Sequence, residues 1–448
     1  MTAARDPALD ALYPAHLAQL RRLFDAALEA TGLERVVVGA GAQHMIFRDD
    51  MPYPFRCYAG FKWWVPVTDN PNCYLVYGKG AARPTVLFWQ PRDYWHLSAA
   101  APDAAWASAV ELVPIAEPVE LGRHLGADLA RTAFLGESEP TADALGFGVR
   151  NPAALLAHLD HHRAWKTPYE VACLERASAR AVRAHRAAEA AFHAGGSEYE
   201  IHLEYCRATG QVEHELPYGN IIALNEHAAV LHYQHQSPLR PAQRRSFLID
   251  AGAQHHGYAS DITRTYSAQH DEFQALVDSL DAGQRRLCAA VQPGLDYPAL
   301  QRAAHLEVGA ALHAHGLTEL EPEDAFARRV THAFYPHGVG HLLGLTVHDA
   351  GGFSAAPSGG LIPKPEDEPY LRLTRRVEAG WVFTVEPGLY FIGLLLDALR
   401  ASPEGKRVDW KKVEALAPFG GIRIEDDVLV TGSGHRNLTR EAFAAARV

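Results

Sequence analysis

Two aspartates, eleven positions apart in one expected hairpin, constrain the fold of this chain more than any other feature. The apolar run 247–249 predicts a buried strand that ends at Asp250. A polar turn centred on residues 255 and 256 separates it from a second β-rich run at 258–266. A hairpin symmetric about that turn places Asp250 directly opposite Asp261, where two like charges repel each other. The pair therefore indicates either a compensating cation or the ordinary turn chemistry of Asp beside Gly.

The length and charge of the chain limit the classes of protein to consider. Its 448 residues exceed the size at which single cores stop growing, so we expect two domains. A formal net charge of −11 argues against nucleic-acid and anionic-membrane partners. No apolar run reaches the roughly 18–20 residues of a membrane span, and the amino terminus lacks an apolar signal core. Five scattered cysteines without Cys-x-x-Cys spacing indicate reduced thiols, and together these features predict a cytoplasmic protein.

The first part of the chain alternates helical and β-like segments. Leucines at helical spacing predict a helix over 7–31, which Gly32 ends. Further segments are three expected strands at 36–38, 73–77 and 85–89, and alanine-rich helical pieces at 101–112 and 122–131. This alternation predicts an α/β amino-terminal domain over residues 1–162.

The second part, residues 163–448, begins at a clear helix signal. Thr167-Pro168-Tyr169-Glu170 is a capping box with proline at the first helical position, and Ser197 to Glu200 forms a second capping box. Helical patterns at 271–291 and 298–315 follow. Short β runs are expected at 221–224, 229–233, 246–250, 258–266, 382–386, 389–392 and 422–430. Helices grouped around mostly antiparallel hairpins predict an α+β catalytic domain.

Several titratable residues follow apolar runs in this second part. Taken singly, a histidine is usually a core or surface residue, Glu-Pro-Gly is usually a turn, and an Arg-x-Glu strand face can be solvated. Taken together they form a charge pattern, since four carboxylates would repel one another and two divalent cations would neutralise them. One imidazole among carboxylates suits manganese, cobalt, iron or zinc. The residues are Asp250, Asp261, His341, Glu386 and Glu425.

In this order the residues resemble the signature of the pita-bread dinuclear metallopeptidases. The pattern is Asp, a second Asp eleven positions on, His337-Gly338-Val339-Gly340-His341, Glu386-Pro387-Gly388 and Arg423-Ile424-Glu425. Segments 49–55, Trp64 to Val67, Asp93-Tyr94-Trp95-His96, 218–233 and 418–426 look like the bacterial Xaa-Pro dipeptidase (prolidase) subfamily, so the resemblance covers nearly the whole chain. It implies a pita-bread (creatinase and aminopeptidase-like) catalytic domain. It also implies that the five residues above hold two divalent ions, most commonly Mn²⁺ with Co²⁺ or Zn²⁺ as alternatives, with Asp261 and Glu425 bridging them.

The same resemblance assigns roles to further residues. Glu386 would also move the proton of an attacking water that the two metal ions activate. His232, His337 and His348 would act on substrate and oxyanion, and Arg423 would orient carboxylates. The substrate-binding residues implied are Tyr218, Tyr297, Leu371 and Arg372, with Asp50 and Trp95 reaching across a homodimer whose amino-terminal domain caps the neighbouring cleft.

The resemblance implies hydrolysis of dipeptides with carboxy-terminal proline, with organophosphate triester hydrolysis as a side activity. Arg372 matches an arginine that, in bacterial dipeptidases, pairs with the free proline carboxylate. The alternative for Arg372 is a surface arginine, because Arg375 and Arg376 follow at once. Two other functions stay open, an Xaa-Pro aminopeptidase acting on longer peptides and a non-catalytic peptide-binding protein of the same fold. Residues 394–412 have no assigned role.

Overall fold

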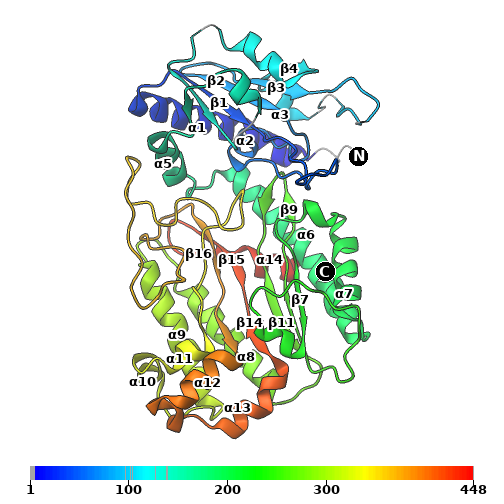
Figure 1. The fold of residues 1–448 in the computed structure, drawn as a ribbon. Helices are drawn as coiled ribbons and strands as arrows, with labels where there is room; N and C mark the ends of the chain where they lie inside the picture. Colours follow the sequence, from blue (N-terminus) through cyan, green and yellow to red (C-terminus); the bar gives the residue numbers. More distant parts are fainter. Residues whose placement is uncertain are drawn as a thin grey trace.

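The computed structural model describes residues 6–95, 97–100, 102, 104–126, 128–137 and 140–446. His96 of the Asp93–His96 motif and single positions of the expected helices at 101–112 and 122–131 lie outside these residues. The amino-terminal part (blue to cyan) lies on one end of the catalytic part (green to red), as Figure 1 shows. No helix of the described part has both the length and the apolar composition needed to cross a membrane.

The amino-terminal part is one mixed sheet covered by helices. Helix α1 (Pro7–Thr31) begins at Asp6, whose side chain accepts from Leu9 N, and ends at Gly32 in the left-handed conformation. The six-stranded sheet has the order β4-β3-β2-β1-β5-β6. Its strands are β1 (Arg35–Gly39), β2 (Tyr74–Gly78), β3 (Thr85–Trp89), β4 (Glu111–Ile115), β5 (Thr132–Leu135) and β6 (Val149–Arg150), and its short helices are α2 (Ala59–Trp64), α3 (Ala105–Ser108) and α4 (Pro140–Ala144).

Two helical expectations in this part are wrong in extent. Helix α3 stops at Ser108 because the chain from Glu111 pairs in parallel with β3, so strand pairing overrides the alanine-rich composition. Among the described residues of the segment expected to be helical over 122–131, only the end of a 3₁₀ helix, η1 (Pro118–His124), is helical. Gly126 has φ +73°, a left-handed conformation that does not continue a helix.

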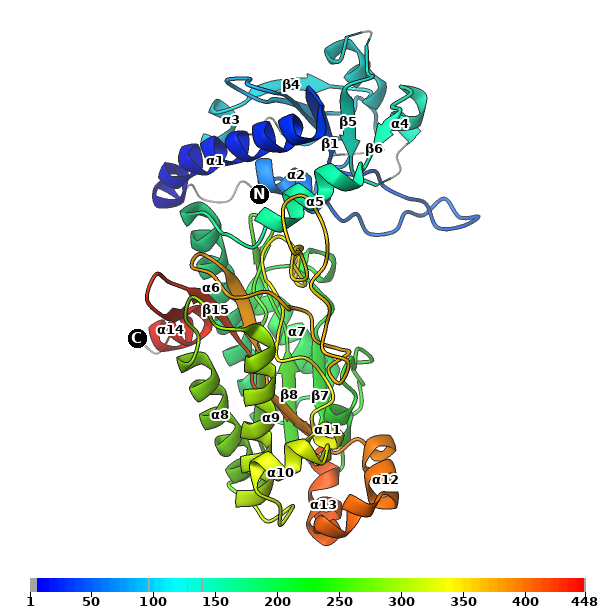
Figure 2. The same cartoon turned by 90° about the vertical axis from the view of Figure 1, so that its left-hand side faces the viewer.

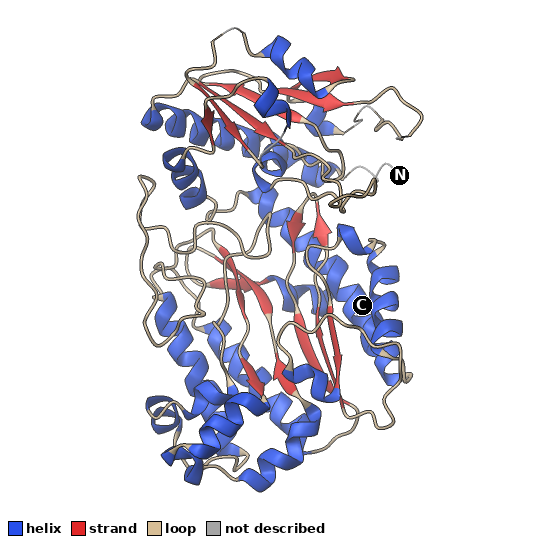
Figure 3. Ribbon diagram, viewed as in Figure 1, coloured by secondary structure: helices blue, strands red, loops and turns tan. Residues whose placement is uncertain are grey.

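The catalytic part surrounds small antiparallel sheets with long helices (Figures 2 and 3). Both capping boxes form: α6 (Pro168–His193) begins at Thr167 and α7 (Glu198–Thr209) begins at Ser197. Helix α5 (Ala153–His162) is the last helix of the amino-terminal part. The other helices of the catalytic part are α8 (Glu272–Ala289), α9 (Tyr297–Ala314), α10 (Pro322–Ala327), α11 (Val330–Phe334), α12 (Gly393–Ala401), α13 (Trp410–Leu416) and α14 (Leu438–Ala445). The α/β and α+β parts confirm the expected fold class.

The strands of the catalytic part form four small sheets. Their orders are β11-β8-β7, β12-β15-β16, β13-β14 and β10-β9. The strands are β7 (Ile221–Leu224), β8 (Ser246–Asp250), β9 (Gln254–His255), β10 (Tyr258–Ala259), β11 (Thr263–Ser267), β12 (Val382–Val385), β13 (Gly388–Tyr390), β14 (Gly421–Arg423), β15 (Asp426–Val430) and β16 (His435–Asn437). The strand expected at 229–233 is wrong, because the chain forms a 3₁₀ turn, η3 (Asn225–Ala229), and then loops.

The expected register of the central hairpin is also wrong, by two residues. Asp250 pairs with Thr263, not with Asp261, and His255 pairs with Tyr258. The turn is centred on His256 and Gly257, whose φ angles of 52° and 84° are those of a tight primed hairpin turn. The centre of the turn therefore lies one residue later than expected, between His256 and Gly257.

One apolar core runs across the contact between the two parts. Leu9, Phe24 and Trp64 of the amino-terminal part belong to the same buried cluster as Tyr258 and Val382 of the catalytic part. Such a continuous core fixes the two parts relative to each other. The groove where they meet is therefore a stable place for a binding site.

Candidate metal centre

Five separate strand ends and loops bring the expected ligands together. Asp250 ends β8, and Asp261 precedes β11. Glu386 lies between β12 and β13, and Glu425 lies between β14 and β15. His341 lies in the loop after α11, next to the bridge between Leu342 and Phe383. A second bridge joins Thr263 to Glu425. The small sheets thus meet at the point where their acidic side chains project.

The distances are those of a site that can hold a cation. The Nε2 atom of His341 lies 3.3 Å from Oδ2 of Asp261 and 3.6 Å from Oε1 of Glu386. The ligand atoms of Asp261, His341 and Glu425 all lie within 4.8 Å of one another. His341 Nδ1 lies 3.1 Å from the carbonyl oxygen of Leu342, which can only accept a hydrogen bond. The neutral imidazole therefore keeps its lone pair on Nε2, the atom that faces the carboxylates.

Burial and mutual repulsion disturb the protonation of these groups. Burial, followed by the charges of the neighbouring carboxylates, raises the pKa of Glu425 well above its usual range. Burial likewise raises the pKa of Asp250 and brings the pKa of Glu386 to about 7. Burial alone would lower the pKa of His341, but its contact with Asp261 and the charge of Glu386 raise it to about 9. Without a cation the site therefore retains protons, and a divalent cation would take their place, which is the behaviour of a metal-ligand set.

Three uncharged or cationic side chains hold the carboxylates in place. Tyr218 donates to Asp250 at 2.8 Å and to Asp261 at 2.5 Å. Arg423 donates from Nη2 to Asp250 Oδ2 at 2.7 Å, and Thr263 donates to Glu425 at 2.6 Å. These contacts involve both oxygens of Asp250 and one oxygen each of Asp261 and Glu425, and each such oxygen keeps a second lone pair that can bind a cation. Fixed carboxylates favour a defined metal geometry.

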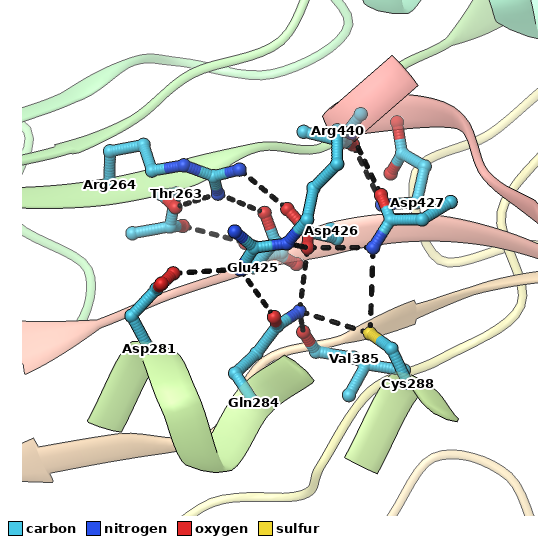
Figure 4. Close-up of polar contacts among 12 residues, drawn as sticks. Thr263, Arg264, Asp281, Gln284, Cys288, Val385, Glu425, Asp426, Asp427 and Arg440 are labelled. Atoms are coloured by element: carbon cyan, nitrogen blue, oxygen red, sulfur yellow. Dashed lines mark hydrogen bonds and ion pairs between the residues drawn. The ribbon is translucent and has the colours of Figure 1, made fainter. Parts of the chain in front are cut away.

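A second buried network supports the strand that follows Glu425 (Figure 4). Asp426 accepts from Arg264 and from Arg440 at 2.6 Å each, and from Gln284 at 2.9 Å. Despite its burial, the charges of Arg264 and Arg440 lower the pKa of Asp426 to about 2. Arg264 also donates to the backbone oxygen of Glu425 at 2.8 Å. Asp426 is thus a structural anion that fixes the backbone at Glu425.

Two of the expected histidines, His232 and His348, line one large cavity. It has a volume of about 930 Å³ and is lined by both parts of the chain, including Tyr218, His232 and His348. The ring of His348 lies edge-on to that of His341, with centroids 4.4 Å apart. Partial desolvation in the cavity, followed by the charges of His341 and Arg372, lowers the pKa of His348 to about 4, although part of its side chain is exposed. Burial lowers the pKa of His337 to about 3, so both are neutral near pH 7. His337 Nδ1 lies 3.7 Å from Glu386 Oε2, and its Nε2 lies 2.8 Å from the hydroxyl of Tyr390.

The remaining expected substrate residues occupy different environments. Arg372 is exposed, and it is one of the positive charges that lower the pKa of His348 after the effect of burial. Tyr297 and Leu371 are fully buried, and Tyr297 donates to the carbonyl of Thr384 at 3.2 Å. Asp50 and Trp95 lie on exposed loops and are not among the described residues that line the cavity.

Sequence reasoning missed some residues that shape this site. Thr263, Tyr390 and Asp427 carry no motif signal of their own, and only the paired strands bring them to the carboxylates. Asp427 accepts from the backbone nitrogen of Asp261 at 3.2 Å. The alternation of β11 could have indicated Thr263, because it shares a face with Thr265 and both are buried.

Comparisons with known proteins agree with this arrangement. Residues 11–161 match the Xaa-Pro dipeptidase N-terminal domain, and residues 172–432 match metallopeptidase family M24. An Xaa-Pro dipeptidase of Xanthomonas campestris pv. campestris (strain B100) is 51% identical over 98% of this chain and 99% of its own length. One from Stenotrophomonas maltophilia (strain K279a) is 50% identical over 97% of this chain and 98% of its own length.

Solved structures share the fold at lower identity. Aminopeptidase P from E. coli gives a TM-score of 0.69 at 22% identity and covers 95% of this chain and 99% of that chain. The aminopeptidase PepP of Pseudomonas aeruginosa gives 0.70 at 23% identity and covers 99% of this chain and 100% of that chain. The family match over most of the catalytic part and the full-length relatives lead to one conclusion: the chain belongs to the Xaa-Pro dipeptidases of metallopeptidase family M24.

Proposed function

We propose that this chain hydrolyses dipeptides of the form Xaa-Pro, using two divalent ions held by the five ligand residues of the metal centre. The observation that carries the proposal is the convergence of four carboxylates, two buried and two half-buried, and one buried imidazole near a cavity of about 930 Å³. Relatives about half identical over their whole length bear the name Xaa-Pro dipeptidase. The aminopeptidase alternative is tested below by the length of the peptide that is cleaved.

The ligand set fits hard or borderline divalent cations. Carboxylate oxygens with a single imidazole suit Mn²⁺ best, with Co²⁺ and Zn²⁺ as alternatives, and thiolate ligands are absent from the described centre. Asp250, Asp261, His341, Glu386 and Glu425 would hold the two ions. When bound, such ions acidify water and polarise a carbonyl oxygen.

The protein groups around the ions supply the proton transfers and the positioning. Glu386, which lies 3.6 Å from His341 and 3.7 Å from His337, would accept a proton from the attacking water and pass it to the leaving nitrogen. His348 and His232 line the cavity and are placed to donate hydrogen bonds to the oxyanion. Arg423 holds Asp250 in one orientation through the 2.7 Å contact.

The proline specificity follows from the chemistry of the bond. An Xaa-Pro amide has no N–H, so it cannot form the backbone contacts of an extended peptide in an ordinary peptidase cleft. Its leaving nitrogen needs a proton after attack, which a neighbouring acid such as Glu386 can return. A site with a proton carrier next to a roomy cavity suits this substrate.

We further propose that Arg372 selects dipeptides by pairing with the free carboxylate of proline. Arg372→Ala removes a guanidinium that can bind a carboxylate with two hydrogen bonds, so KM for an Xaa-Pro dipeptide should rise about 10–100-fold. Steady-state kinetics on an Xaa-Pro dipeptide and an Xaa-Pro-Yaa tripeptide, with Mn²⁺-loaded protein, measure this change. Arg376→Ala is the matched control, because Arg376 is also exposed and lies four residues away. Faster cleavage of the tripeptide by the unmodified protein would assign an aminopeptidase instead.

We also propose that residues 1–162 form a domain that caps the cleft of a second copy. Phe47 is 87% exposed, Trp95 77% and Leu97 99%, which is unusual for apolar side chains. A homodimer that buries these loops would bring Asp50 and Trp95 to the partner's cavity. Sedimentation equilibrium should give twice the chain mass, and Trp95→Glu should shift the protein toward monomer. A monomeric unmodified protein at micromolar concentration would contradict this proposal.

A further inference from the structure

A second polar cluster lies outside the metal centre and has no role in the function proposed so far. We define the Glu368 cluster as Gln301 and His305 of α9, His332 of α11, and Glu368 of the segment 353–373. Oε1 of Glu368 lies 3.2 Å from Nε2 of both histidines. Oε2 accepts from the Gln301 amide at 2.9 Å. One carboxylate is thus contacted by three side chains.

The geometry of the two histidines is that of an anion-binding pair rather than a metal site. Their rings stack with centroids 4.1 Å apart and 24° between the planes. An imidazole binds a metal in its own ring plane, and two nearly parallel stacked planes do not meet at one ion. Although burial opposes it, hydrogen bonds from His305 and His332 lower the pKa of Glu368 to about 2. Glu368 is therefore a fixed anion at neutral pH.

Gln301 connects this cluster to the loop that carries His337. Its oxygen accepts from the backbone nitrogen of Val339 at 2.6 Å, and its amide donates to the carbonyl of His337 at 3.2 Å. The same side chain therefore contacts Glu368 on one side and the backbone around Gly338 on the other. His337 in turn faces Glu386 at 3.7 Å, so the connection reaches the metal centre.

The segment after Glu368 packs tightly against the same loop. A Cβ atom on Gly338 would lie 2.9 Å from the carbonyl oxygen of Tyr370 and 3.1 Å from Cα of Leu371. Leu371 is fully buried, whereas Arg372, the next residue, is exposed. With Glu368 fixed on one side and Leu371 buried, the backbone between them has little freedom, and the position of Arg372 follows from it.

We propose that Glu368 is a positioning residue that sets the place of Arg372 and thereby the preference for dipeptides. This inference rests on the proposed pairing of Arg372 with the substrate carboxylate. Glu368 would not contact the substrate. It would act by holding the 369–372 backbone against the loop from His337 to Val339. Its loss should therefore change substrate affinity and length selection more than the rate of the chemical step.

The test uses Glu368→Ala and Glu368→Gln in the full-length, Mn²⁺-loaded protein. In Glu368→Ala, amide hydrogen exchange of peptides covering 365–374 should quicken by at least about tenfold, since the loss of even one charge-assisted hydrogen bond predicts that factor. KM for the dipeptide should rise about tenfold, with kcat within about threefold of the unmodified protein. Glu368→Gln keeps one accepting oxygen and should show smaller changes. Glu366→Gln is the matched control, since Glu366 is exposed in the same segment.

The outcomes distinguish a failure of the role of Glu368 from a failure of the proposed pairing between Arg372 and the substrate carboxylate. Unchanged exchange in Glu368→Ala, while Arg372→Ala alters dipeptide selection, would refute the role of Glu368 alone. Faster exchange with unchanged KM and selectivity would show that Glu368 orders the segment without setting specificity, and would also overturn the inference. If Arg372→Ala leaves selection unchanged, the carboxylate pairing itself fails and the specificity role of Glu368 fails with it.

Discussion

Glu425→Gln is expected to lower hydrolysis of an Xaa-Pro dipeptide more than about 1,000-fold, because the loss of a proposed ligand carboxylate would remove several kcal/mol of metal-derived stabilisation of the transition state. The same substitution should not weaken the metal-free protein. Glu425 is buried among Asp261, Glu386 and Asp250, and burial followed by their charges raises its pKa well above the usual range. A neutral amide removes that repulsion and still offers an oxygen to Thr263, so the free energy of unfolding of chelated protein should rise rather than fall.

Kinetics and thermal unfolding, each with and without Mn²⁺, separate the two effects. Metal should stabilise the unmodified protein, since it binds the folded state, and should stabilise Glu425→Gln much less. Glu323→Gln, at an exposed position of α10, is the matched control. Full activity of Glu425→Gln, or a large loss of stability in its chelated form, would contradict the assignment of Glu425 as a ligand.

Asp349→Ala should cost about 3–5 kcal/mol of unfolding free energy, the range for breaking a buried ion pair. Asp349 follows His348 and is buried with two cations, Arg163 and Lys166, whose side chains are 8% and 1% exposed. Lys166 Nζ lies 3.0 Å from Oδ2, and Arg163 donates to Oδ1. Without the carboxylate, Lys166 keeps only its hydrogen bond to the carbonyl of Arg163 among the described contacts, and Arg163 keeps only the weaker charge interaction with Asp160 among the described acids.

Chemical denaturation of Asp349→Ala beside Asp397→Ala measures this cost. Asp397 is exposed on α12, and its substitution should stay within about 0.5 kcal/mol of the unmodified protein. A cost below about 1 kcal/mol for Asp349→Ala would show that Arg163 and Lys166 find other partners or water. Because Asp349 adjoins His348, a lower kcat should accompany the lost stability.

The parts of the fold that local chemistry dictates were predictable from the sequence. Thr167 and Ser197 each begin a helix with a reciprocal capping box, and Gly32 ends α1 in the left-handed conformation. The wrong expectations arose where strand pairing or backbone geometry, rather than local composition, determines the secondary structure. Glu111 enters a strand because β3 is beside it, and Gly257 shifts the hairpin so that Asp250 faces Thr263.

The expected metal ligands could be identified because they stand at strand ends in a recognisable order. Several of the residues that contact these ligands and hold them in place could not be identified from the sequence. Tyr390 and Thr263 contact the site through antiparallel pairing, and Glu368 meets His305 and His332 only after two helices pack. Spacing along the chain carries no information about such contacts, since each joins residues more than thirty positions apart.

The most direct test of the central claim is a metal titration of chelated protein with release of free proline from an Xaa-Pro dipeptide as the readout. We expect no cleavage without metal, and activity that rises with added Mn²⁺ and saturates near two ions per chain, as a dinuclear site requires. Cleavage that survives chelation, or no proline release from protein shown to hold two ions, would contradict the assignment of a metal-dependent Xaa-Pro dipeptidase.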